Sequence, residues 1–509
     1  MLLFLPLGVL ALTLVALGAS SLQRGFRSSW LLALAGAALA WVGLLFLRLQ
    51  LPLVISLPVW WAGEGLEYSA TFVLDSLSWP LAFVVSSLLV ASLLGRVRQA
   101  VMASWASWAP GLAITGLALL SALSGDLLTF LFTWTLVDVI STALHLSQLR
   151  RPEERRLVLQ QVPILLLGSF FLFAAWTFSF YGQEFTAILI FVSVTLRLGL
   201  WTPRLTWSST SRLTGDSASV MRLMPLAASL ALLARAESIA EPARSVLLLL
   251  ILLPAFYAVG PWLLSSDKDQ VFLWELGQAS LVAAAALGGQ GQAALAFSLL
   301  LLLGRSLLPF VQHIPRFRLP LVVLSVAALS GLPFTAGYWS VGMYASWASP
   351  LVFAFLPIQA ALLASWMRQA LQPPAEPLPA EPWMRTIQWL GYSTVPIVYV
   401  CFGLGLLPSF ASGEAALPWW PAAAILMGAA SFYLVYRRRK SQLHPRAEFA
   451  LDWIFSLRWL QMLVAWLMRA ISWCLNSLSS LLEGHAGVLW ALLFMALLLS
   501  LAGQFGLGS

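Results

Sequence analysis

Charged residues are scarce in this 509-residue sequence, at 9% of the total, while hydrophobic residues make up 60%. Soluble globular proteins carry about 25% charged residues, so the composition excludes that class. Apolar stretches of about twenty residues, long enough to cross the hydrocarbon core of a bilayer, recur along most of the chain. The sequence therefore predicts an all-α polytopic membrane protein.

Cysteine and histidine are also rare, at two and four residues. The sequence has no CxxC motif, no Cys/His cluster and no haem signature, and Cys401 and Cys474 lie in hydrophobic or amphipathic surroundings. It also lacks a nucleophile–base pair and a phosphate-binding loop. We therefore expect no cofactor, no metal site and no catalytic centre in this chain.

The apolar stretches give sixteen candidate spans, and we expect about 14–16 transmembrane helices. The first stretch has no charged leading region and no clear cleavage site, so we expect a retained helix there rather than a signal peptide. The candidates are residues 2–19, 29–47, 77–95, 104–123, 126–147, 159–180, 184–202, 217–235, 244–264, 271–289, 293–312, 320–345, 349–367, 386–407, 418–436 and 486–503.

The net charge of +8 follows the membrane topology and does not indicate nucleic-acid binding. With the N-terminus outside, the cytoplasmic loops hold twenty Lys and Arg residues, whereas the opposite loops hold only Arg48, Arg235 and Arg244. This asymmetry is typical of the positive-inside rule. We expect a multi-pass protein of the bacterial cytoplasmic (inner) membrane that contacts lipid and binds no nucleic acid.

Two segments near the C-terminus differ from the spans. Residues 369–385 contain five prolines and predict a stiff cytoplasmic loop. Residues 450–483 place apolar side chains at intervals of three or four with polar ones between them, the pattern of an amphipathic helix. Its tryptophans favour a lateral helix along the membrane or a partner, before a last span at 486–503. The alternative is that 452–475 crosses the membrane.

Gly and Pro interrupt two hydrophobic helices, one in each half of the chain, at 197–204 and 329–340. Such breaks free backbone groups that lipid cannot satisfy, so they survive only inside protein or beside a wet cavity. Paired breaks are typical of inverted repeats around an ion or substrate path, which favours a transporter-type scaffold. The breaking residues are Pro203, Gly331, Pro333 and Gly337.

Five segments resemble, in order and spacing, the antiporter-like proton-channel subunits of respiratory complex I, Mrp antiporters, membrane-bound hydrogenases and inorganic-carbon uptake complexes. These segments are Phe72–Ser78, Asp126–Trp134, 217–235, Leu329–Ser340 and Cys401–Pro408. The resemblance implies two inverted five-helix repeats with broken seventh and twelfth helices that line the path. It also implies partner membrane subunits in a larger NADH-quinone-oxidoreductase-like, hydrogenase or carbon-uptake complex. Quinone or NADH is then not bound by this chain.

The resemblance divides the chain into seven parts. They are N-terminal helices 1–3 (residues 1–100), a first repeat of helices 4–8 (101–240), a second repeat of helices 9–13 (241–368), the Pro-rich loop (369–385), helices 14–15 (386–440), the lateral helix (450–483) and the final helix (486–509).

The titratable residues of that family are largely replaced here. Thr135 stands where the family has a Glu after Trp134, although Asp138 lies one turn further on. Depending on the alignment, Arg197 or Leu198 falls at the seventh-helix lysine. The other replaced positions are Met221 (beside Arg222), Phe297, Leu301, Arg305 and Val341.

An arginine stays protonated in proteins, so it positions or repels an ion but hardly releases a proton. A buried carboxylate could still relay one. Each charge inside a span costs about 2.5–3.5 kcal/mol on insertion scales, so these charges need partners or a purpose. The candidates are Asp138, Arg197, Arg222, Glu275 and Arg305.

Two hypotheses remain open from the sequence. The first is a proton- or cation-translocating subunit with an altered charge line. The second is a non-conducting scaffold, in which the same charges form structural ion pairs. Asp75, at a helix entrance, is expected to be a cap or loop contact rather than a relay.

Overall fold

The computed structural model describes most of the chain up to residue 438. The described residues are 2–20, 28–58, 61–63, 66–99, 105–149, 152–180, 182–201, 216–236, 239–263, 270–313, 317–345, 350–372, 381–405 and 417–438, with Trp466, Arg469 and Trp473. The chain divides into two units, 1–442 and 443–509, and every element below belongs to the first. Apart from those three residues, the expected lateral helix (450–483) lies outside the described residues, as does the final span (486–503).

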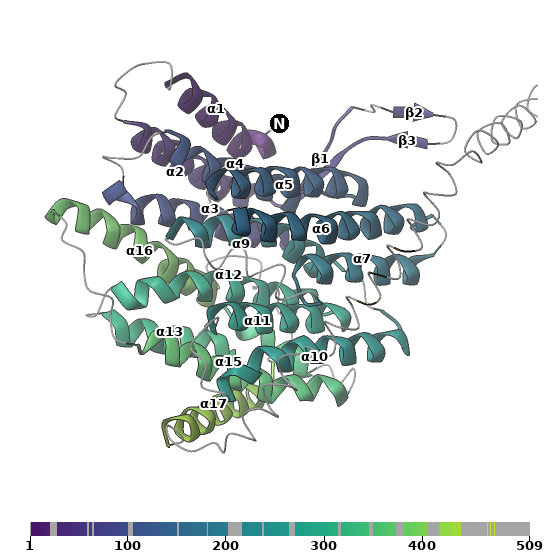
Figure 1. Cartoon of the computed structure of the whole chain (residues 1–509), viewed down its shortest axis with the longest axis vertical. Helices are drawn as coiled ribbons and strands as arrows, with labels where there is room; N and C mark the ends of the chain where they lie inside the picture. Colours follow the sequence, from purple (N-terminus) through teal and green to yellow (C-terminus); the bar gives the residue numbers. More distant parts are fainter. Residues whose placement is uncertain are drawn as a thin grey trace, which may run out of the picture. The chain divides into compact units, whose positions relative to one another are not determined.

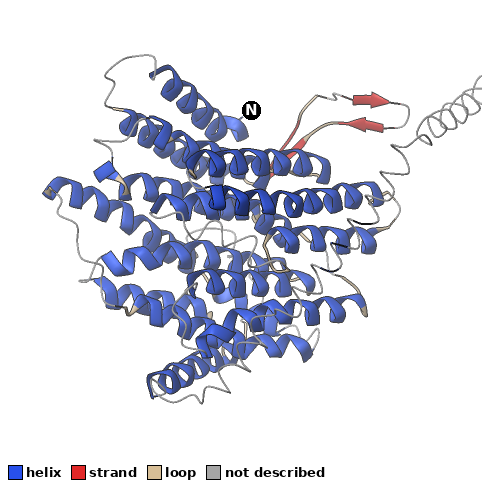
Figure 2. Ribbon diagram, viewed as in Figure 1, coloured by secondary structure: helices blue, strands red, loops and turns tan. Residues whose placement is uncertain are grey.

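The first unit is built almost entirely of helices that run side by side (Figures 1 and 2). In chain order they are α1 (Leu5–Ser20), α2 (Ser29–Leu47), α3 (Ser78–Gly95), α4 (Ala109–Ala122), α5 (Leu127–Gln148), α6 (Pro152–Phe178), α7 (Gln183–Arg197), α9 (Asp216–Ala234), α10 (Ala243–Leu263), α11 (Gln270–Leu287), α12 (Gly291–His313), α13 (Arg318–Ser330), α14 (Gly342–Ala345), α15 (Phe355–Ala370), α16 (Pro382–Gly403) and α17 (Trp420–Arg438).

Eight helices of the described residues are long and apolar enough to cross a membrane, and five shorter helices are also apolar. Fifteen of the sixteen predicted spans coincide with helical segments. The prediction of an all-α polytopic membrane protein is therefore confirmed. The boundaries differ: α6 and α16 begin earlier than predicted, at Pro152 and Pro382, and α7 ends earlier, at Arg197.

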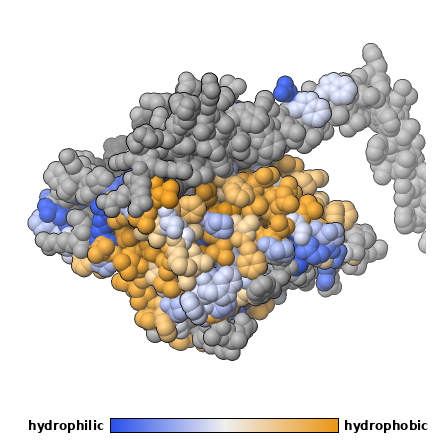
Figure 3. All heavy atoms as spheres, turned by 90° about the horizontal axis from the view of Figure 1, so that it is seen from below, coloured by the Kyte–Doolittle hydropathy of each residue, from blue (hydrophilic) through white to orange (hydrophobic). Residues whose placement is uncertain are grey.

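The surface of this unit suits a lipid environment. Figure 3 shows hydrophobic residues across the middle of one face, with hydrophilic residues gathered toward its two sides. Large apolar side chains such as Leu12, Phe170 and Leu319 are 62–71% exposed. Apolar side chains exposed to this extent would be unfavourable in water, whereas the hydrocarbon core of a bilayer solvates them.

A small β structure between α2 and α3 was not predicted from the sequence. Strands β1 (Leu53–Ser56) and β4 (Thr71–Leu74) pair antiparallel, as do β2 (Trp61–Gly63) and β3 (Leu66–Tyr68). These four strands together are called the hairpin. The turn between α4 and α5 continues this pairing, because Val73 N–H donates to Leu123 O (2.7 Å) and Gly125 N–H donates to Thr71 O (2.8 Å). A Cβ at Gly125 would crowd the Val73 and Thr71 side chains, so the close approach requires glycine.

Helix α9 lies at the centre of the unit. It contacts α4, α5 and α7 from the first half, and α11 and α12 from the second half. Its described side chains from Leu223 to Ala234 are almost all buried, including Ser229. Helices that carry predicted ion-path residues are therefore brought against one common element.

The two predicted interruptions fall at helix ends. Helix α7 ends at Arg197 and is followed by Gly199 in the left-handed region (φ 72°), while Pro203 lies outside the described residues. Helix α13 ends at Ser330, followed by Gly331, also left-handed (φ 79°), the exposed Pro333, and a 3₁₀ turn at Tyr338–Val341 that leads into α14. Left-handed glycines commonly end helices because they carry no Cβ.

Candidate functional site

The first site is a buried ion pair between α5 and α7. Asp138 and Arg197 are only 8% and 4% exposed, and Arg197 Nη2 donates to Asp138 Oδ1. Among the described residues, the second carboxylate oxygen, Asp138 Oδ2, has no hydrogen-bond partner, and neither has Arg197 Nη1. The pair is thus neutralised as a unit but not saturated with hydrogen bonds.

An aromatic ring completes the surroundings of Arg197. Its Cζ lies 4.1 Å from the centre of the Trp134 ring, and Trp134 is one helical turn before Asp138 on α5. A cation over an indole face is attracted by the ring quadrupole, most strongly where both are desolvated. Arg197 is therefore held by a carboxylate and an aromatic face from the same helix.

A second buried pair joins α11 and α12. Arg305 Nε donates to Glu275 Oε1 at 2.5 Å, with the Glu275 side chain fully buried and the Arg305 side chain 15% exposed. Among the described residues, each half of the fold thus holds one carboxylate–arginine pair whose carboxylate is buried. Four of the five charges singled out from the sequence form these two pairs.

The fifth charge, Arg222, lies on α9, whose backbone is described there while the Arg222 side chain is not. Helix α9 contacts all four helices that carry the two ion pairs, α5, α7, α11 and α12. Buried polar atoms without a partner among the described residues also occur on these helices, among them Ser229 Oγ on α9 and Gln278 Oε1 on α11. Buried polar atoms of this kind are where internal water binds.

The helix end at Ser330 is satisfied by side chains that sequence reasoning missed. Gln359 Nε2 of α15 donates to Leu329 O (2.9 Å), and Tyr344 Oη of α14 donates to Gln359 Oε1 (2.7 Å). The Gln359 amide thus links the end of α13 to α14. A glutamine between the apolar residues Ile358 and Ala360 was the available signal.

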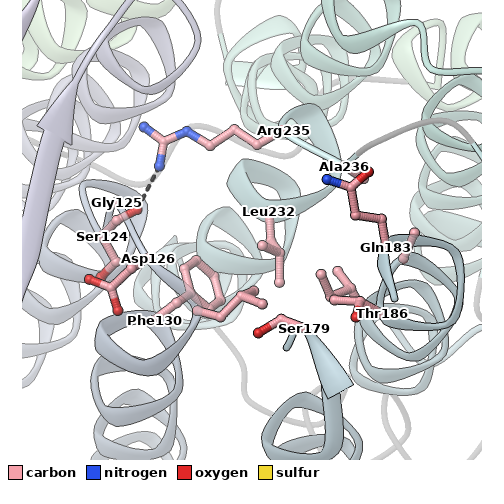
Figure 4. Close-up of a pocket in the computed structure, with 13 residues that line it drawn as sticks. Ser124, Gly125, Asp126, Phe130, Ser179, Gln183, Thr186, Leu232, Arg235 and Ala236 are labelled. Carbon is pink, nitrogen blue, oxygen red and sulfur yellow. Dashed lines mark hydrogen bonds between the residues drawn. The ribbon is translucent and has the colours of Figure 1, made fainter. Parts of the chain in front are cut away.

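A third group of polar residues lies where the turns α4–α5 and α6–α7 meet the end of α9. Arg235 donates to Ser124 O (2.6 Å), which ties the end of α9 to the α4–α5 turn (Figure 4). Arg235 also pairs, at 3.3 Å, with Oδ2 of Asp75, which follows strand β4. Asp75 Oδ1 also accepts from Ser78 N–H (2.7 Å) at the start of α3. Asp75 is therefore a cap and loop contact in the structure.

Asp126 caps α5 and holds the hairpin. Its carboxylate accepts from Thr129 N–H (2.8 Å), Thr71 N–H (3.0 Å) and Tyr68 Oη (2.9 Å). Burial alone would raise the pKa of Asp126, yet the hydrogen bonds from Thr129 and Thr71 hold that pKa below its ordinary value. Likewise, burial opposes ionisation of Asp75, but the Arg235 guanidinium and Ser78 hold the pKa of Asp75 below its ordinary value.

A cavity of about 400 Å³ opens beside this group, lined by residues of the two turns, α5, α7 and α9 (Figure 4). Asp126 lies on one side, Gln183 and Thr186 on the other, with Phe130 and Leu232 between them. Sequence reasoning did not identify it, because it is formed by turns far apart in the chain.

Comparison with known proteins gives matches by structure alone. No family model and no curated protein matches the sequence. The structure is similar to a chain of the Mrp complex from Dietzia sp. DQ12-45-1b (TM-score 0.68, 16% identity), covering 99% of this chain and 63% of that one. The present chain thus spans less than two thirds of the Mrp chain.

Two further solved structures share the arrangement. One is a chain of the membrane-bound sulfane sulfur reductase, an archaeal respiratory membrane complex (TM-score 0.66, 15% identity, 98% of this chain and 99% of that one). The other is a chain of respiratory complex I from Thermus thermophilus (TM-score 0.50, 18% identity, 85% and 96%). At such identities the similarity shows the fold: the chain has the fold of the antiporter-like membrane subunits, as its sequence motifs predicted.

Proposed function

We propose that this chain is a proton- or cation-translocating membrane subunit of a larger complex. The observation that carries the proposal is the presence of two buried carboxylate–arginine pairs, Asp138–Arg197 and Glu275–Arg305, on four helices that all contact α9. Ionisable residues inside membranes are costly and characteristically mark ion paths. The helix ends at Arg197 and Ser330, one in each half of the chain, add support, and the first of them carries a charge of the Asp138–Arg197 pair.

Each pair can work as a proton switch. While Arg197 contacts Asp138, the carboxylate is held as an anion. When the arginine turns away, a lone buried charge is unfavourable, and Asp138 takes up a proton. Arg197 keeps its own charge throughout, and its return expels the proton. Asp138 Oδ2, without a partner among the described residues, is the oxygen at which that proton would bind.

Transfer between the halves would run past α9. Ser229 and Gln278 supply buried polar atoms there that water can bridge. Gln278 lies one turn from Glu275 on α11, so both side chains share a face of that helix.

The test is proton flux in liposomes that contain the native complex, with wild type beside Asp138→Asn and Arg305→Ala. The proposal predicts that, per assembled complex, both variants lose flux. The matched control is Glu241→Gln, which removes the carboxylate of an exposed pair with Arg244 (2.9 Å) and should leave flux unchanged. Equal flux in all four proteins would contradict the proposal.

A second candidate function, a non-conducting scaffold, is favoured by one observation. Both buried carboxylates already contact arginines, which do not release protons. Under either function Asp138→Asn would weaken the subunit, because Arg197 is left buried and unpaired. A scaffold alone would show no change in the flux of the complexes that do form.

The setting of the subunit is part of the proposal. The three structures of the same fold come from complexes, which supports other membrane subunits as partners, in an NADH-quinone-oxidoreductase-like, hydrogenase or carbon-uptake complex. We further propose two inverted repeats (101–240 and 241–368), an N-terminus outside, and the bacterial cytoplasmic membrane. The asymmetry of basic loop residues supports this orientation.

A further inference from the structure

We propose that the cavity beside Asp126 and Arg235 is an outward-facing water vestibule, and that Phe130 closes its floor above the Asp138–Arg197 pair. This inference deepens the proposed function and rests on it for the identity of the moving ion. Its occupants would be water and small hydrated cations, including hydronium.

The size and lining of the cavity suit water. At about 400 Å³, it has room for on the order of ten water molecules. Its rim is polar, with Ser179, Gln183 and Arg235, whereas Phe130, Ile190 and Leu232 are apolar (Figure 4). A polar, hydrated entrance above a closed ring of apolar side chains is the arrangement of a hydrophobic constriction, which blocks ions by excluding water.

The charges near the rim attract cations without trapping them. Asp75 and Asp126 each contribute −1 and Arg235 contributes +1, so this group carries one net negative charge. The Asp126 carboxylate already accepts hydrogen bonds from Thr129, Thr71 and Tyr68. It therefore raises the local concentration of cations but is poorly suited to bind one tightly.

A continuous stack of side chains connects the floor to the ion pair. Phe130, only 3% exposed, meets Trp134 edge to face with ring centres 5.0 Å apart, and Trp134 carries Arg197 on its face at 4.1 Å. Residues 130, 134 and 138 follow one another by one helical turn, so about 12 Å of helix separates the floor from Asp138. Movement of Arg197 off Asp138 would change the packing of Trp134 and hence of Phe130.

Successive positions on one face of α7 lie at increasing depth from the cavity mouth, so they can test how far a reagent penetrates. Gln183, Ala187 and Ile190 line the cavity, and Val194, which is fully buried, follows on the same face before Arg197. A cysteine at each position reports whether a charged, membrane-impermeant thiol reagent reaches that depth. Cys401 and Cys474 are first replaced by Ser to give a cysteine-free background.

The experiment uses the full chain with its native partners in sealed vesicles of both orientations. Ala187→Cys should be modified from the outer side only, and Val194→Cys should be protected from both sides. Adding Phe130→Ala should make Val194→Cys as reactive as Ala187→Cys. Phe132→Ala is the matched control, because Phe132 lies on the same helix but is 51% exposed, and Val194→Cys should stay protected there.

The inference has two parts, the vestibule and its closure by Phe130, and either can be overturned. Protection of Ala187→Cys from the outer side would overturn the first, because it would mean that no vestibule opens there. Modification of Val194→Cys with Phe130 intact, or its protection in the Phe130→Ala variant, would overturn the second, because it would mean that Phe130 is not the closure. Because labelling does not depend on flux, the vestibule can stand while the translocation proposal fails, and the reverse.

Discussion

At the scale of single residues, the two arginines determine what the buried carboxylates can do. Asp138 and Glu275 each contact one arginine on a neighbouring helix, so a positive side chain lies against each buried carboxyl group. Removing one partner of such a pair leaves an uncompensated buried charge, whereas removing both does not. Within each pair, the stability of the packed helices therefore depends on both partners being present.

This coupling predicts a non-additive double-mutant cycle. Asp138→Asn or Arg197→Gln alone should lower the free energy of unfolding by about 3–5 kcal/mol, because the remaining charge is buried and unpaired. The double variant should lose much less than the sum. Unfolding in detergent would measure this, with the exposed Glu241–Arg244 pair as control, where solvent screens the charges and each change should have little effect. Additive losses at Asp138 and Arg197 would contradict the coupling.

The carboxylates of Asp75 and Asp126 predict a pH dependence. Their pKa values in the folded protein are lowered, so their contribution to stability is complete above their unfolded values, near pH 4, and is lost as the pH falls through the folded values. The hairpin and the α4–α5 turn should thus loosen only in acid. Thermal unfolding across pH should show a smaller loss below about pH 4 in Asp126→Asn than in wild type. The same loss of thermal stability in acid for both proteins would refute this prediction.

At the scale of elements, glycine decides how α13 ends. Gly331 combines a left-handed backbone with crowding, since a Cβ there would lie 3.2 Å from Ser340 Oγ and against the Val341 side chain. Gly337 has an ordinary φ of −91° but packs directly on Ala328 O. Gly405 is left-handed (φ 65°), and no atom of the described residues lies within 4 Å of the place that a Cβ would take. Substitutions at these three glycines can therefore distinguish the cost of backbone strain from the cost of crowding.

Alanine at these positions should therefore cost different amounts. Gly405→Ala should cost about 1–2 kcal/mol from backbone strain alone. Gly331→Ala should add roughly 1–3 kcal/mol of crowding to a similar strain. Gly337→Ala should show the crowding without the strain. Unfolding free energies of the three variants test this order, and equal losses at Gly331 and Gly405 would show that the break is not tightly packed.

Helices were predictable because hydropathy reports burial in lipid directly, and the spans at 126–147 and 293–312 match α5 and α12 closely. The hairpin was not, because its strands are three or four residues long and depend on the distant turn at Leu123–Gly125. The charges Asp138, Arg197, Glu275 and Arg305 were identifiable as costly residues in apolar surroundings. Their pairing, the Trp134 contact and the role of Gln359 depend on which helices pack together, and hydropathy does not encode this.

At the scale of the whole first unit, α9 sits between two similar arrangements of charge. Its contacts with α5 and α7 on one side, and with α11 and α12 on the other, place one central helix between two carboxylate–arginine pairs. A change in either pair that shifts α9 would alter the packing around the other, because packed cores transmit displacement rather than absorb it. Coupling between the halves is thus expected to run through α9.

The most direct test of the central claim is proton flux through the reconstituted complex carrying Asp138→Asn together with Arg197→Gln. This double variant removes the carboxylate without leaving a lone buried charge, so it separates loss of the path from loss of the fold. Flux is predicted to fall to the level of protein-free liposomes while the amount of assembled complex stays at that of wild type. Flux equal to wild type in the assembled double variant would contradict an ion path through Asp138.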